Sequence, residues 1–407
     1  MATLDDGTPL YLPLTLPGEF VHAHPVVKRG EGWAGAADIL EASADRVAPP
    51  CPHFITCGGC ALQHWRHDRY LAWKTDLLCS ALRRGGYPDA VLAPIFAVGP
   101  HARRRIDFAV RRRSGGVDLG LHQKRGAEIV DLAVCTVLHP SLEALIGPLH
   151  DLLRGISALK REGSVAINLL TSGPDMLLRT DGALSSPDRS RLAEFATVHA
   201  MSRITSAAGS MGLEPAAMLR PATTVFSGVS VLPPPGAFLQ AAEASEAAII
   251  AAVLAGLPDM TPRQRVAELY AGCGTLTFAL AGRARVAAYE GDIDAFNALR
   301  AAVNAAQLAG RIEVYRRDLA RQPLFVKDLA VFAAVVLDPP HGGAAEQTAQ
   351  IAVSGVKRVI YVSCNPGALA RDAHRLHDAG YRLLSAVPID QFLWSPRLES
   401  VCVFVRD

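Results

Sequence analysis

The chain has almost no net charge and no apolar run long enough to cross a membrane. Its 407 residues carry 41 lysines and arginines against 39 aspartates and glutamates, a formal net charge of +2. Any basic surface must therefore be a local patch. Every apolar run breaks well before the roughly 18 residues that a membrane span requires, and no secretion signal opens the chain. We expect a cytoplasmic protein with no membrane contact and no obligate protein partner.

Cysteine is scarce for a disulfide-stabilised protein. Eight cysteines in a chain of this length, without a secretion signal, leave metal ligation, catalysis or packing as their uses. Three of them fall within ten residues, in Cys51-Pro-His-Phe-Ile-Thr-Cys57-Gly-Gly-Cys60. Such a cluster predicts a metal site, and thiolates suit either an iron-sulfur cluster or zinc.

The third glycine of a dinucleotide-binding loop is also missing. The stretch Glu268-Leu-Tyr270-Ala-Gly272-Cys-Gly274 follows an apolar run and holds only a short Gly-x-Gly turn, which lets the backbone approach a ligand. This disfavours a dinucleotide and favours S-adenosylmethionine. Glu290 closes the next apolar run, where an acidic side chain can hold ribose hydroxyls. Asp318 follows the third run, where it could meet an adenine amino group.

Apolar runs alternate with helical segments from residue 265 onward, and an Ala-rich helix is expected at 237–257. This alternation predicts an α/β fold with a Rossmann-like, parallel-rich sheet of seven strands, one of the last two being antiparallel. The predicted strands are 266–270, 286–290, 312–315, 334–337, 359–363, 381–387 and 400–405.

The rest of the chain divides by composition. Short extended runs suggest a β module at 1–45, followed by the cysteine cluster and a helix at 63–84 in a segment spanning 46–90. A central α+β domain is expected at 91–232, and Pro233-Pro-Pro-Gly236 marks the boundary to the last domain, 233–407.

One cysteine stands at a predicted strand-to-helix turn. In Tyr361-Val-Ser-Cys364-Asn-Pro366 the thiol ends an apolar run and precedes a proline that can open a helix. A helix N-terminus can lower the pKa of a thiol and make it a nucleophile, although a buried inert cysteine fits the same turn. Asp338-Pro-Pro-His341 ends the neighbouring predicted strand and could face the same crevice. It could also be read as the motif of an amino-group methyltransferase.

The strongest charge cluster in the chain lies at residues 101–125. As paired strands it would present arginines, with an aromatic ring able to stack on a base, to an RNA. The alternative is a solvated β-hairpin that turns at Arg113-Ser-Gly-Gly. The candidate RNA contacts are Arg103, Arg104, Arg105, Phe108, Arg111 and Arg113, and the cluster also includes Arg112, Lys124 and Arg125.

Five motifs in matching order closely resemble the bacterial RNA 5-methyluridine methyltransferases. They are Cys-x5-Cys-x2-Cys, Glu-Leu-Tyr-Ala-Gly-Cys-Gly, Asp-Pro-Pro, Ser-Cys-Asn-Pro and the terminal Leu-Glu-Ser-Val. The resemblance runs from about residue 16 to the C-terminus. It implies dependence on S-adenosylmethionine, and the subgroup with a 4Fe-4S cluster acts on 23S ribosomal RNA. Ribosomal RNA is favoured over transfer RNA, the alternative substrate, because the family's tRNA enzymes usually lack the cysteine cluster.

The resemblance also implies a role for each matching residue. Cys364 would add to C6 of the target uracil, and Glu399 would later remove the proton from C5. Asp338 would hydrogen-bond the uracil ring, and Gln240 would bind the cofactor. Cys135 would be the fourth cluster ligand. Because the reacting atom is stacked in folded RNA, the base would have to be flipped into the pocket.

The sequence departs from the family's pattern in three places. His341 stands where the family often has arginine, and Leu393-Trp-Ser-Pro-Arg-Leu-Glu399 replaces a Pro-His-Thr-x-His-Val-Glu run. The N-terminal module matches only the latter half of the family's TRAM barrel, notably Leu16-Pro-Gly-Glu19. The setting of Glu399 is therefore the least predictable part of the site.

Overall fold

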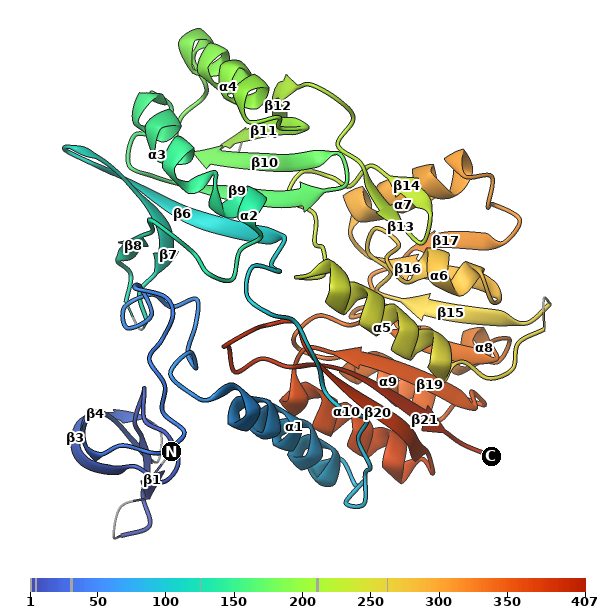
Figure 1. The fold of residues 1–407 in the computed structure, drawn as a ribbon. Coiled ribbons are helices and arrows are strands. Elements are labelled where there is room, and N and C mark those ends of the chain that lie inside the picture. Colours follow the sequence, from blue (N-terminus) through green and yellow to red (C-terminus); the bar gives the residue numbers. More distant parts are fainter. Residues whose placement is uncertain (1, 4–5, 30–31, 125, 210–211, 262) are drawn as a thin grey trace.

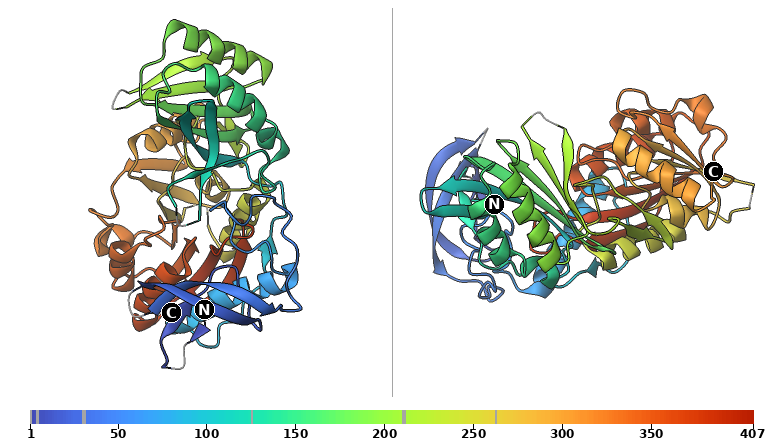
Figure 2. Two further views of the ribbon diagram at one scale, coloured as in Figure 1. Left: turned by 90° about the vertical axis from the view of Figure 1, so that its left-hand side faces the viewer. Right: turned by 90° about the horizontal axis from the view of Figure 1, so that it is seen from above.

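The computed structural model describes residues 2–3, 6–29, 32–124, 126–209, 212–261 and 263–407, which fold into three β-rich parts (Figure 1). Two large sheets lie along the chain's central and C-terminal parts, and a small sheet holds the N-terminus at one end (Figure 2). Within these residues, no helix has both the length and the apolar character needed to cross a membrane.

The N-terminal module is a four-stranded sheet of order β1-β2-β4-β3. Glu19 joins it to the next segment through an ion pair with Arg46, whose Nε lies 2.5 Å from the carboxylate. The relation of this sheet to a TRAM barrel stays a prediction. Its strands are β1 (Ala2–Thr3), β2 (Pro9–Tyr11), β3 (Phe20–Arg29) and β4 (Gly32–Glu41).

The central part is a seven-stranded sheet of order β12-β11-β10-β9-β6-β7-β8, followed by a separate β13-β14 hairpin. Its helices are α2 (Pro140–Glu143), α3 (Ile146–Gly155) and α4 (Ser186–Val198). Its strands are β6 (Arg105–Arg113), β7 (Gly116–His122), β8 (Ile129–Asp131), β9 (Glu162–Leu170), β10 (Gly173–Thr180), β11 (Arg203–Ala208), β12 (Leu213–Met218), β13 (Thr224–Phe226) and β14 (Val229–Val231).

All seven predicted strands of the C-terminal sheet are present, and the α/β fold is confirmed. The order is β17-β16-β15-β18-β19-β21-β20-β5, with β21 antiparallel to both neighbours. The eighth strand, β5, was not predicted because its two residues give no periodic signal. The strands are β5 (Phe96–Ala97), β15 (Arg265–Leu269), β16 (Arg285–Glu290), β17 (Ile312–Arg316), β18 (Ala334–Leu337), β19 (Arg358–Ser363), β20 (Arg382–Asp390) and β21 (Glu399–Val405).

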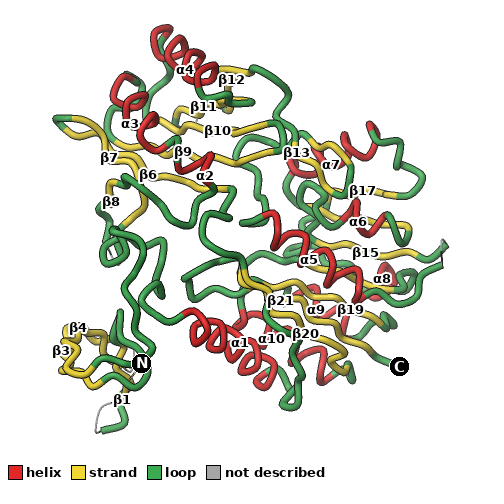
Figure 3. Tube along the Cα trace, in the orientation of Figure 1, coloured by secondary structure: helices red, strands yellow, loops and turns green. Residues whose placement is uncertain are grey.

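Helices cover both faces of this sheet (Figure 3). One face carries α5 (Glu243–Gly256), α6 (Thr277–Ala281) and α7 (Ile293–Ala305). The other carries α1 (His67–Arg84), α8 (Val326–Leu329), α9 (Ala345–Ala352) and α10 (Pro366–Asp378). The division of the chain at residues 45, 90 and 232 stays a prediction, although α1 and β5, both ahead of residue 232, pack with the C-terminal sheet.

The helix predicted at 237–257 begins only at Glu243. The preceding residues lie outside any helix or strand, and there Ala237 O accepts from Asn168 Nδ2 and Ala241 O accepts from the Arg104 N–H. These contacts to the central part take the backbone out of the helix. Gln240 therefore stands on a loop that is bonded to the central part and precedes α5.

Candidate active site

The predicted catalytic residues meet where three neighbouring strands of the C-terminal sheet end. Cys364 follows β19, Asp338 follows β18, and Glu399 is the first residue of β21. Ser363 and Ser400 are partners in the β19-β21 ladder, so Cys364 and Glu399 extend the two strands at the same edge. The sheet's strand order also reverses between β15 and β18, and open α/β sheets bind ligands at such a point.

A chain of buried amide groups joins the two carboxylates. Gln240 donates from Nε2 to Asp338 Oδ2 at 3.2 Å and accepts at Oε1 from Gln391 Nε2 at 2.8 Å. Gln391 Nε2 also donates to Glu399 Oε2 at 2.7 Å. The Gln391 Oε1 atom accepts from the Ala241 N–H at 2.9 Å, which fixes the orientation of the amide. Both carboxylates are therefore held by neutral donors.

Among the described residues, no ion pair holds either of these two carboxylates, and no cation is a cause of their pKa shifts. Glu399 is 3% exposed and its Oε1 has no hydrogen-bond partner among the described residues. Burial, and then the charge of Asp338, raise the pKa of Glu399 well above its usual value. Burial likewise raises the pKa of Asp338 to about 7, against the hydrogen bond from Gln240. Asp338 can thus exchange a proton near neutral pH, and Glu399 holds its proton more tightly than an ordinary carboxyl, which suits acid or base chemistry.

The thiol of Cys364 is partly buried and faces a histidine. Its Sγ lies 3.8 Å from His341 Nδ1. Burial, followed by the charges of Glu399 and Asp338, raises the pKa of the thiol to about 11. The expectation of a thiol activated by the helix N-terminus is not met, because Asn365 caps that helix and the carboxylates oppose the thiolate.

The Gly-x-Gly turn has the backbone that the sequence predicts. Gly272 and Gly274 have φ angles of 55° and 102°, and a Cβ on Gly274 would lie 2.7 Å from Leu299 and Phe278 atoms. The loop is closed by Glu290, whose Oε2 accepts from the Gly272 N–H at 2.7 Å. Tyr270, between strand and turn, also has a positive φ of 65°.

The other predicted cofactor residues lie at the ends of adjacent strands. Glu268 in β15 is buried, its Oε2 has no partner among the described residues, and burial raises its pKa to about 8. Such an orphaned carboxylate fits a cationic ligand above the turn. Asp318, after β17, accepts from the Ala320 N–H at 3.1 Å and is half-exposed. Their roles toward a cofactor stay predictions.

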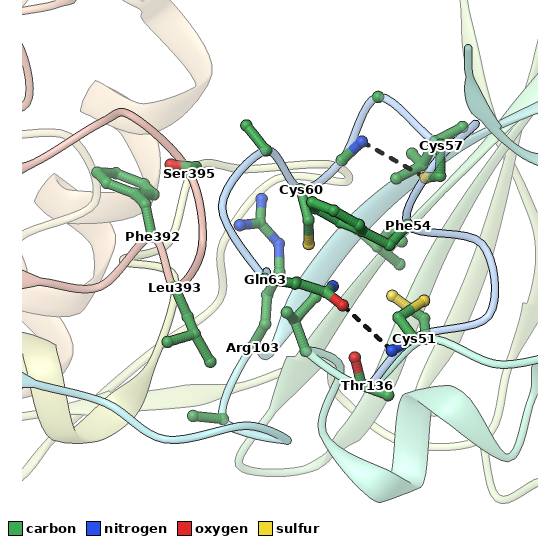
Figure 4. Close-up of a pocket in the computed structure, with 18 of the residues that line it drawn as sticks. Cys51, Phe54, Cys57, Cys60, Gln63, Arg103, Thr136, Phe392, Leu393 and Ser395 are labelled. Atoms are coloured by element: carbon green, nitrogen blue, oxygen red, sulfur yellow. Dashed lines mark hydrogen bonds between the residues drawn. The ribbon is translucent and has the colours of Figure 1, made fainter. Parts of the chain in front are cut away.

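The four predicted metal ligands line one cavity of about 520 Å³. Figure 4 shows Cys51, Cys57 and Cys60 on one side of it, with Phe392 and Leu393 across from them. Cys135 belongs to the same lining, and all four thiols are free of disulfides. The cysteine segment is fastened to β7 by a hydrogen bond from the Gly58 N–H to His122 O at 2.9 Å.

Four cysteine thiols around one cavity are a set of donors whose chemistry suits a metal group. Burial, and then the neighbouring cysteines, raise the pKa of Cys135 to about 12, so four thiolates would need a cation to offset their charge. No three of the four sulfurs lie mutually within 4.8 Å. Tetrahedral zinc, with Zn–S bonds near 2.3 Å, would draw all four to about 3.8 Å of one another. In a 4Fe-4S cluster each thiolate binds a different iron and the sulfurs stand farther apart.

Two of the predicted RNA contacts are corrected by their burial. Phe108 is completely buried in the core of the central sheet and cannot stack on a base. Arg104 is 9% exposed and pairs internally, with its Nη2 2.5 Å from Glu246 and its Nε donating to Gln240 O. Alternation along β6 buries residues 106, 108 and 110, and Arg104 directly precedes the strand, which the charge count could not reveal.

The hairpin arginines are engaged by carboxylates. Arg111 pairs with Glu128 and Glu162, and Arg113 pairs with Asp118 and Glu128. These contacts favour the alternative of a solvated hairpin at this end of β6 and β7. Arg125 lies outside the described residues.

Arg103 and Arg105 are different, because they line the cysteine cavity together with Arg397. The Arg105 guanidinium stacks over the Phe238 ring at 4.2 Å, and its Nε has no hydrogen-bond partner among the described residues. Burial, and then the three neighbouring arginines 103, 104 and 397, lower the pKa of Arg105 to about 10. An anion would relieve this repulsion, so these two arginines remain candidate phosphate contacts.

Sequence reasoning missed Gln391, the role of His341, and Arg397. Gln391 follows Asp390 directly at the end of a strand, and two polar residues at a strand end were the available signal. His341 stood out only as a departure from a motif. Nothing in the sequence links Arg397 to Arg103 and Arg105.

Comparison with known proteins identifies relatives across the whole chain. Residues 236–407 match the family described as tRNA (Uracil-5-)-methyltransferase. An uncharacterised RNA methyltransferase of Brucella melitensis is 40% identical over 100% of this chain and 94% of its own length. The 23S rRNA (uracil(1939)-C(5))-methyltransferase RlmD of Pectobacterium atrosepticum is 33% identical over 99% and 90%.

A solved structure shares the fold. The tRNA (uracil-54, C5)-methyltransferase of Pyrococcus abyssi, crystallised with S-adenosyl-L-homocysteine, superimposes with a TM-score of 0.71. The match covers 97% of this chain and 95% of the other at 19% identity, a level at which only the fold is informative.

Proposed function

The chain belongs to the RNA uracil-5-methyltransferase family of S-adenosylmethionine-dependent enzymes, and we propose that it forms 5-methyluridine in 23S ribosomal RNA by covalent catalysis at Cys364. The observation that carries this proposal is the meeting of one thiol and two high-pKa carboxylates at the ends of β18, β19 and β21. A thiol can attack C6 of uracil, while the carboxylates serve as proton donor and base.

The first half of the reaction uses Cys364 and Asp338. The thiol loses its proton to solvent and the thiolate forms a bond from Sγ to C6, which pushes the C5–C6 π electron pair toward the C4 carbonyl and places negative charge on its oxygen, O4. Asp338, whose pKa is about 7, can donate a hydrogen bond to that oxygen while Gln240 holds its other side. The carbon C5 becomes nucleophilic as a result.

S-adenosylmethionine supplies an electrophilic methyl group when bound. Glu268, with its orphaned oxygen, and the Gly272 turn, with its close backbone, are the residues that would hold this cofactor with Glu290 at the ribose. Tyr270, Gly274 and Asp318 would complete its surroundings. Gln240 would contact it beside Asp338.

The second half uses Glu399. Once C5 carries both a methyl group and a proton, the Glu399 carboxylate takes that proton. The electron pair of the C5–H bond restores the C5–C6 double bond, the C6–S bond breaks, and Cys364 leaves as a thiolate. Gln391 holds Oε2 of the carboxylate, so the unpartnered Oε1 is the atom available to the substrate.

His341 would assist the thiolate as a hydrogen-bond donor. Asn365 Nδ2, which can only donate, lies 3.4 Å from His341 Nε2. The Asn365 amide is oriented by the bond from the Gly367 N–H to its Oδ1 at 2.9 Å. A neutral His341 therefore carries its proton on Nδ1, facing Sγ.

The cysteine cavity supports a 4Fe-4S cluster held by Cys51, Cys57, Cys60 and Cys135. When bound, the cluster would supply a covalent link between the segment at 51–60 and the central part. We assign no redox step to it. Iron and sulfide analysis after anaerobic purification tests this choice, and stoichiometric zinc without iron would overturn it.

Two arguments favour ribosomal over transfer RNA as the substrate. The relative named for 23S rRNA matches nearly the whole chain at 33% identity. The second argument is the group of four cysteines, because the family's tRNA enzymes usually lack it. Arg103 and Arg105 would contact RNA phosphates near the cavity, and binding should weaken steeply as salt rises.

Labelled methyl transfer to RNA tests the chemistry. Cys364→Ala should abolish methylation and form no protein–RNA adduct, and unimpaired methylation by this variant would exclude the covalent mechanism. Nucleoside mass spectrometry separates the alternatives, because an amino-group methyltransferase would place the methyl on an exocyclic nitrogen. Mapping 5-methyluridine in ribosomal and transfer RNA from cells lacking the protein then identifies the substrate.

A further inference from the structure

We propose that helix α1 positions the catalytic base, with Tyr70 and Lys74 clamping the loop at 390–398 from which Glu399 enters β21. The loop joins β20 to β21, and Gln391 within it holds the Glu399 carboxylate. This inference rests on the proposed function for the role of Glu399. It assigns to α1 a part in catalysis that no motif of the active site indicates.

Lys74 is completely buried and spends all three of its N–H donors on this loop. Its Nζ donates to Asp390 Oδ1 at 2.5 Å, to Phe392 O at 3.2 Å and to Arg397 O at 2.6 Å. The first two acceptors lie at the start of the loop and the last lies two residues before Glu399. One ammonium group therefore ties both ends of the loop together.

Tyr70, one helical turn before Lys74, holds the start and the middle of the same loop. Its hydroxyl donates to Asp390 Oδ2 at 2.6 Å and accepts from the Trp394 N–H at 2.8 Å. Trp394 has a φ of 58°, a left-handed conformation that is unfavourable for a bulky residue and must be maintained by its surroundings. The Tyr70 hydroxyl supplies part of that restraint.

The segment that follows Cys60 also hydrogen-bonds to the loop at 390–398. The N–H groups of Ala61 and Leu62, directly after Cys60, both donate to Trp394 O, at 2.8 and 3.0 Å. The backbone N–H and the backbone carbonyl of Trp394 are thus both hydrogen-bonded to residues between Cys60 and Lys74. Trp394 and Leu393 also pack with Tyr70 in a small apolar cluster.

Gln391 connects these contacts to Glu399. Asp390, fixed by Tyr70 and Lys74, is followed directly by Gln391, whose amide is the group that orients Glu399 Oε2. A shift of the loop would move Gln391 and free the carboxylate to rotate. Misplacing a catalytic group by about 1 Å can cost about 10²-fold in rate.

Tyr70→Phe is the variant that tests the proposal, because it removes the hydroxyl and keeps the ring. Tyr87→Phe is the matched control: Tyr87 is also buried beside α1, but its hydroxyl donates to Tyr381 O at 3.0 Å and does not contact the loop. Each change removes one buried hydroxyl. A urea denaturation curve for each variant measures the stability that each loses.

Two readouts separate positioning from general destabilisation. In single turnover with RNA, Tyr70→Phe should slow product release from the covalent adduct by about 10- to 10²-fold, so that a denaturant-stable protein–RNA band accumulates. In multiple turnover, the KM for S-adenosylmethionine should stay unchanged. In the free protein, amide hydrogen exchange at residues 390–399 should quicken. Tyr87→Phe should show neither effect.

The outcomes distinguish this inference from the proposed function. Equal adduct levels and equal loop exchange in the two variants would overturn the positioning role. If the wild-type protein methylates no RNA, the proposed function fails, and unchanged exchange at 390–399 in Tyr70→Phe would then also exclude the clamp. The conservative variant Lys74→Arg, which keeps the charge with a different donor geometry, should give an intermediate adduct level.

Discussion

Asp390 and Glu399 are buried carboxylates at the two ends of one loop, and their surroundings are opposite. Asp390 is completely buried, with a lysine ammonium, a tyrosine hydroxyl and the Phe392 N–H as donors. Glu399 is buried almost as deeply, yet it has one neutral amide donor and one oxygen without a partner among the described residues. The charge that most raises the pKa of Glu399 is that of another carboxylate, Asp338.

The difference separates structural from catalytic use of the same chemical group. A buried ion pair with all its donors used is rigid and hard to displace. A buried carboxylate held only by amides keeps a raised pKa and a free oxygen, the two properties that a general base requires. The loop thus puts an anchored acid at one end and a reactive acid at the other.

Replacing Glu399 by glutamine should have the largest effect on the reaction. Glutamine cannot accept the C5 proton, so turnover should fall by about 10²- to 10⁴-fold, and the protein–RNA adduct should persist. Gel electrophoresis under denaturing conditions measures the adduct, and methyl transfer in the first turnover should survive. Normal turnover without an adduct would remove Glu399 from the role of base.

Replacing Lys74 by methionine should have the largest effect on stability. It leaves the Asp390 carboxylate buried without its cation, which costs about 3–5 kcal/mol. The double variant Lys74→Met, Asp390→Leu removes both charges, so it should be clearly more stable than Lys74→Met alone. Urea denaturation of the three proteins provides the measurement, and equal losses in both variants would contradict the account of Asp390 as a paired charge.

The unpaired acids should make stability and activity respond to pH in opposite directions. Burial raises the pKa of Asp338 from 3.8 to about 7, so the folded state binds more protons than the unfolded state in that window. The unfolding free energy should therefore fall as pH rises from about 4 to about 7. Resolution of a preformed adduct should instead quicken as pH rises, because Glu399, whose pKa is raised well above its usual value, must be ionised to take the proton.

Asp338→Asn is the control for the stability half of this prediction. It removes one of the two acids and should flatten the decline measured by urea denaturation at several pH values. A wild-type protein whose stability rises through this window would show that the pKa shifts have the wrong sign.

Much of the C-terminal site was predictable because motif residues at strand ends are positioned by the sheet. Cys364, Asp338 and the Gly272 turn each directly follow an apolar run, and parallel strands bring such ends together. The clamp was not predictable. Lys74 lies four residues after Tyr70 on the buried face of α1, but a lysine on an apolar stripe identifies no partner, and Asp390 is over three hundred residues away.

In the central part, by contrast, the predicted RNA contacts depended on information that the sequence does not give. Counting arginines at residues 101–125 predicted an RNA surface, but charge alone does not say which arginines are neutralised by Glu128 or Glu162, both distant in sequence. Phe108 is buried by its place in the β6 ladder with β9, and Arg104, just before that strand, is buried by its ion pair with Glu246. Whether an arginine is free to bind RNA depends on partners that are distant in the sequence, whereas the end of a strand can be located from the residues around it.

The Cys364 thiol, like Glu399, is a reactive group whose surroundings set its protonation. A change in those surroundings at His341 has the smallest effect that we expect. Glu399 and Asp338 oppose the Cys364 thiolate and Arg397 favours it, and under our proposal the Nδ1–H of His341 also favours it. Because a hydrogen bond to an anion contributes about 1.5–3 kcal/mol when well formed, and this contact is long, His341→Ala should move the midpoint of Cys364 alkylation upward by about one pH unit. Peptide mass spectrometry after brief iodoacetamide treatment at a series of pH values measures that midpoint without RNA. His374→Ala, an exposed histidine on α10, is the control and should leave the midpoint unchanged. A shift of the same size in both variants, or in neither, would mean that the sulfur relies on Arg397 and solvent, and that His341 only replaces the family's arginine in space.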